Sequence, residues 1–152
     1  MKRYSFIGAG NMAYAMVCGM GSADITVYDK ITSQYAKFAP TVKIAKSAPD
    51  AVRCADYIVL AVKPQNFKEL LTEIRESGTE LSGKIFISIA AGVKISSICS
   101  ALGSEVAVVR TMPNTPLLIG KGVTALSRNS LVSDADFEEI KSLFSAIGTV
   151  LT

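Results

Sequence analysis

The hydrophobic positions of this chain follow two patterns that alternate along its length. Short, mainly apolar segments of strand length lie at residues 4–7, 25–28, 57–62, 84–89 and 105–109, and the one at 57–62 is continuously apolar. Between them, apolar residues recur at the spacing of one helix face, as at Phe67, Leu70, Leu71 and Ile74. Continuous apolar runs are typical of parallel strands that are covered on both faces. The pattern therefore predicts an α/β protein with a mainly parallel sheet.

Weaker signals complete this alternation. The other expected elements are a helix before Gly21, a short helix near residues 34–38, a brief strand at 41–44, a short helix at 50–54, a helix from Pro64, a helix at 95–102, a strand at 123–126 and a capped helix at 133–146. Right-handed crossovers then give one doubly wound sheet in the order 3-2-1-4-5-6, with helices on both faces. Ligands bind such a sheet at the carboxyl ends of its strands. We expect residues 1–152 to form one such domain.

Composition argues against several classes of protein. The hydrophobic share of 49% and the charged share of 19% are those of a chain that folds, not of a disordered one. The net charge of +3 comes from basic residues scattered along the chain, so nucleic acid is not an expected partner. No apolar stretch approaches the roughly 20 residues of a membrane span, so a membrane is not expected either.

Cysteine and histidine usage bears on metals and on location. The three cysteines, Cys18, Cys54 and Cys99, show no C-x-x-C spacing, and the chain has no histidine. A Cys/His metal site is therefore not expected. An odd number of unpatterned cysteines indicates a reducing compartment, and we expect the cytoplasm.

A glycine motif follows the first predicted strand. Residues 8–13 read Gly-Ala-Gly-Asn-Met-Ala, which matches G-x-G-x-x-G/A between a strand and a helix. Gly8 permits the tight turn, Gly10 lets the backbone approach a pyrophosphate, and Ala13 keeps the helix close to the strand. The N–H groups of the first helical turn then point at the phosphates. The motif predicts a Rossmann domain that binds NAD(H) or NADP(H), the alternative being a glycine turn needed only for packing.

Asp29 ends the second predicted strand, about 20 positions after Gly8, which is the spacing expected of an acid on the adenosine ribose. On its own this carboxylate favours NAD(H), because it accepts from a free 2′-hydroxyl and repels the 2′-phosphate of NADP(H). Lys30 follows directly and is able to pair with that phosphate, so the sequence leaves both cofactors open. Another interpretation of Asp29 is a cap for the following short helix.

Three further segments follow predicted strands at the same edge of the sheet. They read Ala-Val-Lys-Pro-Gln at 61–65, Ser-Ile-Ala-Ala-Gly-Val at 88–93 and Arg-Thr-Met-Pro-Asn-Thr-Pro at 110–116. Together with residues 6–13 they make the whole chain resemble the amino-terminal, cofactor-binding domain of pyrroline-5-carboxylate reductase. Single motifs are shared with other reductases, such as the β-hydroxyacid dehydrogenases, but the four in this order are typical of this family.

This resemblance implies reduction of 1-pyrroline-5-carboxylate to L-proline, the last step of proline biosynthesis, by hydride transfer from NAD(P)H. It also implies that residues 61–64 and 90–92 lie beside the nicotinamide half. Lys63 as a proton donor and Arg110 as a carboxylate contact are possible roles, but cofactor contact for Lys63 and loop bracing for Arg110 are simpler interpretations. Asn114 is equally explained by stabilising its turn, and no catalytic residue is assigned. The candidate cofactor-binding residues are Gly8, Ala9, Gly10, Asn11, Met12, Asp29, Lys30, Ala61, Val62, Lys63, Pro64, Ala90, Ala91 and Gly92.

The chain departs from this family's pattern at two points. Ala48 stands where family members commonly carry an asparagine near the ribose. The chain stops at Thr152, where the family continues into a helical domain that forms the dimer and contacts the substrate. We therefore expect a fragment that binds cofactor with little or no turnover, and a full-length protein that is a homo-oligomer.

Two other functions stay open at this point. One is a related reductase of another small substrate, of the β-hydroxyacid or F420 type. The other is a non-catalytic nucleotide-sensing module, which the absence of histidine and of a paired acid and base would suit.

Overall fold

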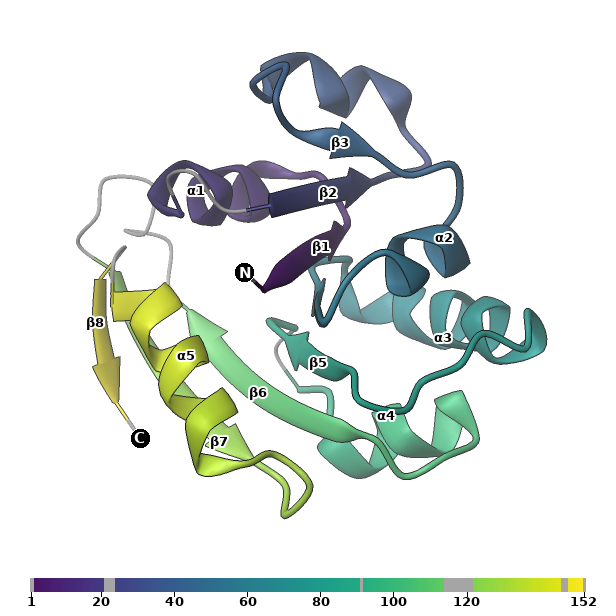
Figure 1. Ribbon diagram of the computed structural model, residues 1–152, viewed down its shortest axis with the longest axis vertical. Coiled ribbons are helices and arrows are strands. Elements are labelled where there is room, and N and C mark those ends of the chain that lie inside the picture. The colour runs from purple at the N-terminus through teal and green to yellow at the C-terminus, as the bar shows by residue number, and fades with distance from the viewer. Residues whose placement is uncertain (1, 21–23, 91, 114–121, 146–147, 152) are drawn as a thin grey trace.

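The computed structural model describes residues 2–20, 24–90, 92–113, 122–145 and 148–151 (Figure 1). In these ranges the strands form one eight-stranded sheet in the order β3-β2-β1-β4-β5-β6-β7-β8. The strands are β1 (Arg3–Ile7), β2 (Asp24–Tyr28), β3 (Lys43–Ile44), β4 (Tyr57–Leu60), β5 (Ile85–Ser88), β6 (Ala107–Pro113), β7 (Gly122–Arg128) and β8 (Gly148–Leu151). Neighbouring strands are parallel except for β6 and β7, which are antiparallel. The predicted α/β class and the order 3-2-1-4-5-6 are confirmed.

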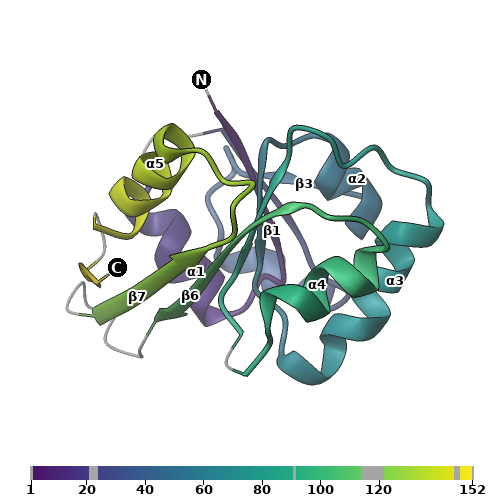
Figure 2. The ribbon, with the colours of Figure 1, turned by 90° about the horizontal axis from the view of Figure 1, so that it is seen from below.

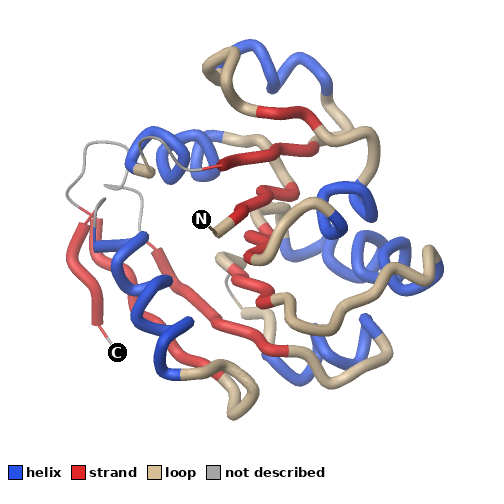
Figure 3. Tube along the Cα trace, in the orientation of Figure 1, coloured by secondary structure: helices blue, strands red, loops and turns tan. Residues whose placement is uncertain are grey.

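Helices cover both faces of this sheet. They are α1 (Asn11–Gly19), α2 (Ala48–Arg53), α3 (Phe67–Glu76), α4 (Ile95–Leu102) and α5 (Asp134–Ser145), with two 3-10 helices, η1 (Thr32–Lys37) and η2 (Pro64–Asn66). Figure 2 shows α1 and α5 on one side of the sheet and α2, α3 and α4 on the other. Figure 3 traces the same layers, with the strands in red and the helices in blue. Across the described ranges, no helix combines the length and the apolar character needed to cross a bilayer.

Two hydrophobic cores, one on each face, explain the continuous apolar runs of the sequence. Successive side chains of a strand point to opposite faces. On β4, Val59 belongs to the core beneath α1 and α5, whereas Ile58 belongs to the core beneath α2, α3 and α4, and neither is exposed. On β5, Ile87 and Phe86 divide in the same way. Because both faces are covered, nearly every position of these strands is apolar, and Ser88 at the end of β5 is the exception.

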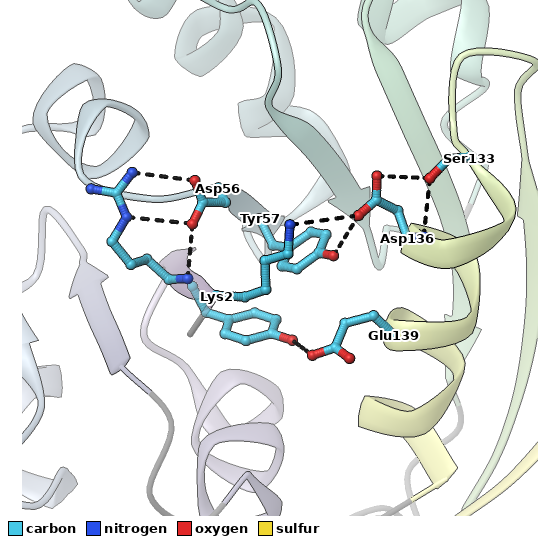
Figure 4. Close-up of polar contacts among 8 residues, drawn as sticks. Lys2, Asp56, Tyr57, Ser133, Asp136 and Glu139 are labelled. Carbon is cyan, nitrogen blue, oxygen red and sulfur yellow. Dashed lines mark hydrogen bonds and ion pairs between the residues drawn. The ribbon is translucent and has the colours of Figure 1, made fainter.

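The helix α5 is fastened to the sheet by two tyrosines at the amino ends of β1 and β4 (Figure 4). The Tyr57 hydroxyl donates to Asp136 Oδ1 at 2.7 Å, and the Tyr4 hydroxyl donates to Glu139 Oε1 at 3.0 Å. The two rings stack with their centroids 5.0 Å apart. Burial, followed by the hydrogen bonds to the carboxylates, raises the pKa of both hydroxyls. Both tyrosines are therefore neutral hydrogen-bond donors at ordinary pH.

Several predicted boundaries differ from the structure. The fourth strand ends at Leu60, two residues earlier than expected, so Ala61 and Val62 belong to the loop. The sixth strand is longer than expected and runs to Pro113, because β7 pairs with it in antiparallel fashion. The strand β8, which the sequence pattern did not predict, adds to β7. The helix α2 begins at Ala48 instead of residue 50, with Ser47 accepting a hydrogen bond from the N–H of Asp50 as its cap.

Candidate functional site

The glycine loop lies at the carboxyl end of β1, between β2 and β4. It is the topological switch point of the sheet, where ligands bind in doubly wound folds. Gly8 has a φ of +104°, and its N–H donates to the carbonyl oxygen of Tyr28 at 2.7 Å. A Cβ at this position would lie 2.6 Å from the carbonyl oxygen of Ala61. The fold itself therefore requires glycine at this turn.

Gly10 is different, because the fold does not require it. Its φ of −78° is open to any residue, and a Cβ built on it meets no described atom within 4 Å. Gly10 is the N-cap of α1, where no side chain caps the helix and the first turn holds no acidic residue. The first-turn N–H groups of a helix have no partner inside the helix and form the positive end of its dipole. The loop thus leaves space in front of an uncapped helix N-terminus.

Asp29 joins the end of β2 to this loop. Its Oδ2 accepts a hydrogen bond from the N–H of Ala9 and its Oδ1 accepts one from the N–H of Ile31, each at 2.8 Å. Its own N–H donates to the hydroxyl of Tyr35, which donates to the Asp29 carbonyl oxygen, again at 2.8 Å. The N-cap of η1 is Ile31, so the interpretation of Asp29 as that helix's cap is wrong. The sequence did not predict the bond to Ala9. The bond to Ile31, two positions after Asp29, is a common contact of aspartate in turns.

These groups border a cavity of about 410 Å³. This volume lies within the range of small-molecule sites, about 300–1,000 Å³. The sequence-predicted residues in its wall are Gly8, Gly10, Asp29, Lys30, Ala61, Val62 and Lys63. The residues in its wall that sequence reasoning missed are Ile7, Tyr28, Ile31, Gln34, Asn66, Glu69 and Leu70. The structure therefore brings together the ends of β1, β2 and β4 with the start of α3.

Three predicted residues lie next to Gly8 or Gly10 in the chain or start α1 but do not line the cavity. Ala9 is buried, and its N–H is the donor to Asp29. Asn11 is exposed at the first position of α1, and Met12 is half-buried and packs against the core. The backbone N–H groups of both residues lie in the first turn of α1, where they have no partner inside the helix and are free to contact a ligand.

Residues of the other predicted loop segments lie elsewhere. Pro64 begins η2 and, with Gly92, lines a second groove of about 790 Å³ between α3 and α4. Ala90 is buried, and its N–H donates to Ser88 Oγ at 3.4 Å. Ala91 lies outside the described residues. The structure thus does not place residues 90 and 92 in the wall that holds Gly8.

Arg110 was expected after the sixth strand but lies within it, opposite Ser88 of β5 and Ser127 of β7. Its Nε is buried and has no hydrogen-bond partner among the described residues. Asn114 lies outside the described residues. Ala48, the position noted beside the ribose, is fully buried at the start of α2 and is absent from the cavity wall.

Two opposite charges pair beside the cavity. Lys30 Nζ lies 2.8 Å from Glu69 Oε1, and the two side chains are 65% and 72% exposed. Their hydrogen bond raises the pKa of Lys30 and lowers the pKa of Glu69, so both are charged at neutral pH. Ion pairs as exposed as this one add little to stability. In the part of the chain that the structure describes, no three His, Cys, Asp or Glu residues gather to hold a metal ion.

A glycine loop at the switch point of a doubly wound sheet defines the Rossmann class of α/β domains. Comparison with known protein families assigns the chain to a specific family within this class. Residues 3–92 match the family model described as NADP oxidoreductase, coenzyme F420-dependent, and the chain belongs to this family.

Curated relatives that match nearly the whole chain are named pyrroline-5-carboxylate reductase. The one from Mycobacterium tuberculosis is 32% identical over 100% of this chain, and the one from Escherichia coli is 34% identical over 97%. The one from Pseudomonas aeruginosa is 37% identical over 98%. The chain spans 55%, 57% and 56% of these three relatives. The resemblance that the four motifs predicted is confirmed.

Solved structures of similar proteins agree in fold. A pyrroline-5-carboxylate reductase from Coxiella burnetii is 31% identical and superposes with a TM-score of 0.89 over 99% of this chain and 58% of that one. The Plasmodium falciparum pyrroline carboxylate reductase, solved with NADP bound, is 29% identical, with a TM-score of 0.83 over 98% of this chain and 56% of that one.

Proposed function

We propose that this chain is the cofactor-binding domain of a pyrroline-5-carboxylate reductase, which reduces 1-pyrroline-5-carboxylate to L-proline with NADH or NADPH. The space at Gly10 carries this proposal. A glycine needed only for packing would have a crowded Cβ position, as Gly8 has, but the Cβ of Gly10 would meet open space. That space lies before an uncapped helix N-terminus and borders the 410 Å³ cavity. A pyrophosphate fits such a place, because it needs close backbone approach and accepts N–H hydrogen bonds.

The residues of this site would divide the work of holding a dinucleotide. The N–H groups of Asn11 and Met12, in the first turn of α1, would donate to pyrophosphate oxygens. Asp29 would accept from a ribose hydroxyl, and Lys63 places a positive charge in the same wall. When bound, the reduced nicotinamide supplies the hydride. The part of this chain is to bind and orient the cofactor.

Contacts to the substrate are a separate part of the proposal. Because the chain spans 55–57% of its curated relatives, we propose that the remaining part of such proteins contacts the imine and its carboxylate. Residues 1–152 would then form the cofactor domain alone, with little turnover by themselves. A homo-oligomer would be built through that same remaining part. The proton donor is not assigned to Lys63 or Arg110.

A reducing compartment, the cytoplasm, is proposed as the location. Cys18 and Cys54 are exposed and free, and Cys99 is buried and free. Exposed free thiols persist in reducing compartments. Cell fractionation with an antibody to the protein tests this proposal, and recovery outside the cytoplasm would refute it.

Calorimetric titration of the chain with NADH and, separately, with NADPH tests cofactor binding. We expect one site per chain for at least one of them. If neither binds while circular dichroism shows a folded chain, the proposal is wrong.

The activity is tested by assaying the intact gene product with the cyclic imine and each reduced cofactor. Oxidation of cofactor that depends on the imine supports the reductase. Preferred use of another small substrate would identify a related reductase instead. Tight cofactor binding without turnover of any imine would identify a nucleotide-sensing module.

A further inference from the structure

Two acidic side chains from different parts of the chain meet in the wall of the same cavity. Asp29 directly follows β2, and Glu69 lies in the first turn of α3. Lys30, the cation that follows β2, reaches across to Glu69, 39 residues away, at 2.8 Å. This ion pair connects the loop after β2 to α3, next to Asp29 in the cavity wall.

Asp29 is held in a fixed orientation by backbone groups. The N–H groups of Ala9 and Ile31 each donate to one of its carboxylate oxygens at 2.8 Å. A carboxylate has about four acceptor positions, so two bonds leave capacity for ribose hydroxyl groups. A 2′-phosphate in the same place would face a carboxylate that has no hydrogen to donate and that its two backbone hydrogen bonds hold in position.

We propose that this wall selects a dinucleotide with a free ribose 2′-hydroxyl over one with a 2′-phosphate, and that Glu69 contributes by holding Lys30. This inference rests on the proposed cofactor function and deepens it. Asp29 repels the phosphate directly. Glu69 acts through Lys30, because it neutralises the cation that would otherwise offset the phosphate charge. Glu69 is thus a positioning residue for cofactor specificity.

The charge states agree with this arrangement. The hydrogen bond raises the pKa of Lys30 and lowers the pKa of Glu69, so the bridge is fully charged at neutral pH. For Lys30 to bind a phosphate, the ion pair between Lys30 and Glu69 would have to break. Glu69 would then remain near the phosphate as a second negative charge beside Asp29. Both steps weaken binding of the phosphorylated cofactor and leave the other cofactor unaffected.

Titration of the 152-residue chain with NADH and with NADPH, at one ionic strength, tests this inference. We expect the wild type to bind NADH about tenfold or more tightly than NADPH. Glu69→Gln should strengthen NADPH binding about two- to fivefold and change NADH binding by less than about twofold, so that the preference for NADH falls. The double variant Glu69→Gln with Lys30→Met should lose that gain, because the freed ammonium is then absent.

Glu76→Gln is the matched control. It removes the same charge from the same helix two turns away, outside the cavity wall. If it strengthens NADPH binding as much as Glu69→Gln does, the effect is one of net charge, and the role of Glu69 is refuted. A wild type that binds NADPH as tightly as NADH overturns the inference while the proposed function stands. Binding of neither cofactor to the folded chain overturns both.

Discussion

The carboxylate of Asp29 accepts a hydrogen bond from the N–H of Ala9, 20 positions earlier in the chain. The contact ties the end of β2 to the glycine loop after β1. The same side chain that would contact a ribose therefore also fixes the loop that would contact a pyrophosphate. Cofactor recognition and loop structure depend here on one residue.

Replacing this side chain should affect both properties. Asp29→Ala leaves the N–H groups of Ala9 and Ile31 without their acceptor, which should lower the free energy of unfolding by about 1–3 kcal/mol. NADH binding should weaken because the loop loses its brace and the ribose loses an acceptor, whereas NADPH binding should weaken less because the repulsion of its 2′-phosphate is also removed. Urea unfolding and calorimetry measure the two effects. Asp24→Ala is the control, since it removes a carboxylate at the start of β2 and breaks only an ion pair with Lys43. An equal loss of stability there would contradict this explanation.

The two glycines of the loop should respond in opposite ways to alanine. Gly8→Ala places a Cβ 2.6 Å from the Ala61 carbonyl oxygen at a φ of +104°, and it should destabilise the fold by more than about 2 kcal/mol. Gly10→Ala should change the free energy of unfolding by less than about 1 kcal/mol yet weaken cofactor binding about tenfold or more. Thermal melts and titrations of both variants decide the matter. Normal cofactor binding by Gly10→Ala would remove the main support for the proposed function.

Lys63 should matter for binding and not for folding. Its side chain is exposed in the cavity wall, where it would face the pyrophosphate. Lys63→Met should weaken binding of both cofactors about three- to tenfold and reduce the salt dependence of binding, because one charge attraction is lost. Titrations at low and high salt measure this. Lys68→Met alters an exposed lysine of the neighbouring groove and should leave binding unchanged; an equal effect there would indicate a general charge effect.

The tyrosine contacts of α5 should make the fold sensitive to alkali. Burial and the carboxylates raise the pKa of Tyr4 and Tyr57, whereas in the unfolded chain a tyrosine titrates near about 10. Above that pH the unfolded chain releases protons that the folded chain retains, so stability is full below about pH 10 and falls as the pH rises further. Each hydroxyl adds at most about 1.4 kcal/mol per pH unit to this fall.

Tyr57→Phe tests this contribution. It should cost about 1–2 kcal/mol at neutral pH, because Asp136 loses a donor, and it should make the alkaline fall shallower. Urea unfolding from neutral to alkaline pH measures both. Tyr14→Phe provides the comparison, because Tyr14 is a half-buried tyrosine of α1 whose ring packs against Phe38. An identical alkaline profile for wild type and Tyr57→Phe would show that the Tyr57 hydroxyl plays no such part.

Much of the fold was predictable because a parallel sheet covered on both faces makes its strands continuously apolar. The run at 57–62 and the glycine turn at Gly8 therefore placed the centre of the sheet correctly. The end of β6 was not predictable in this way, because residues beyond Val109 stay in the strand through antiparallel pairing with β7. The length of β6 is therefore set by its pairing with β7, which follows later in the sequence. In the same way, β8 forms by pairing with β7.

The candidate site was predictable only where its residues belong to one local motif. Gly8 and Gly10 were found because strand, turn and helix are adjacent in sequence. Glu69 was not found, because the polar side of α3 gives no sign of which residue faces a cavity. The hydrogen bond from Ala9 to Asp29 was not predicted either, because it depends on how β1 and β2 lie side by side.

The bond between Tyr4 and Glu139 sets an order for folding during synthesis. These residues are 135 positions apart, and Tyr4 lies on the first strand to leave the ribosome. The turn from β1 through α1 to β2, with its brace at Asp29, needs only the first 29 residues, so the glycine loop is able to form long before α5 has been made. Docking of α5 is then a late closure over a long loop, whose entropic cost rises only slowly with loop length. The nascent chain is thus able to form the glycine loop early, whereas the contact that fastens α5 to the opposite edge of the sheet has to wait until Glu139 has been made, 135 residues after Tyr4.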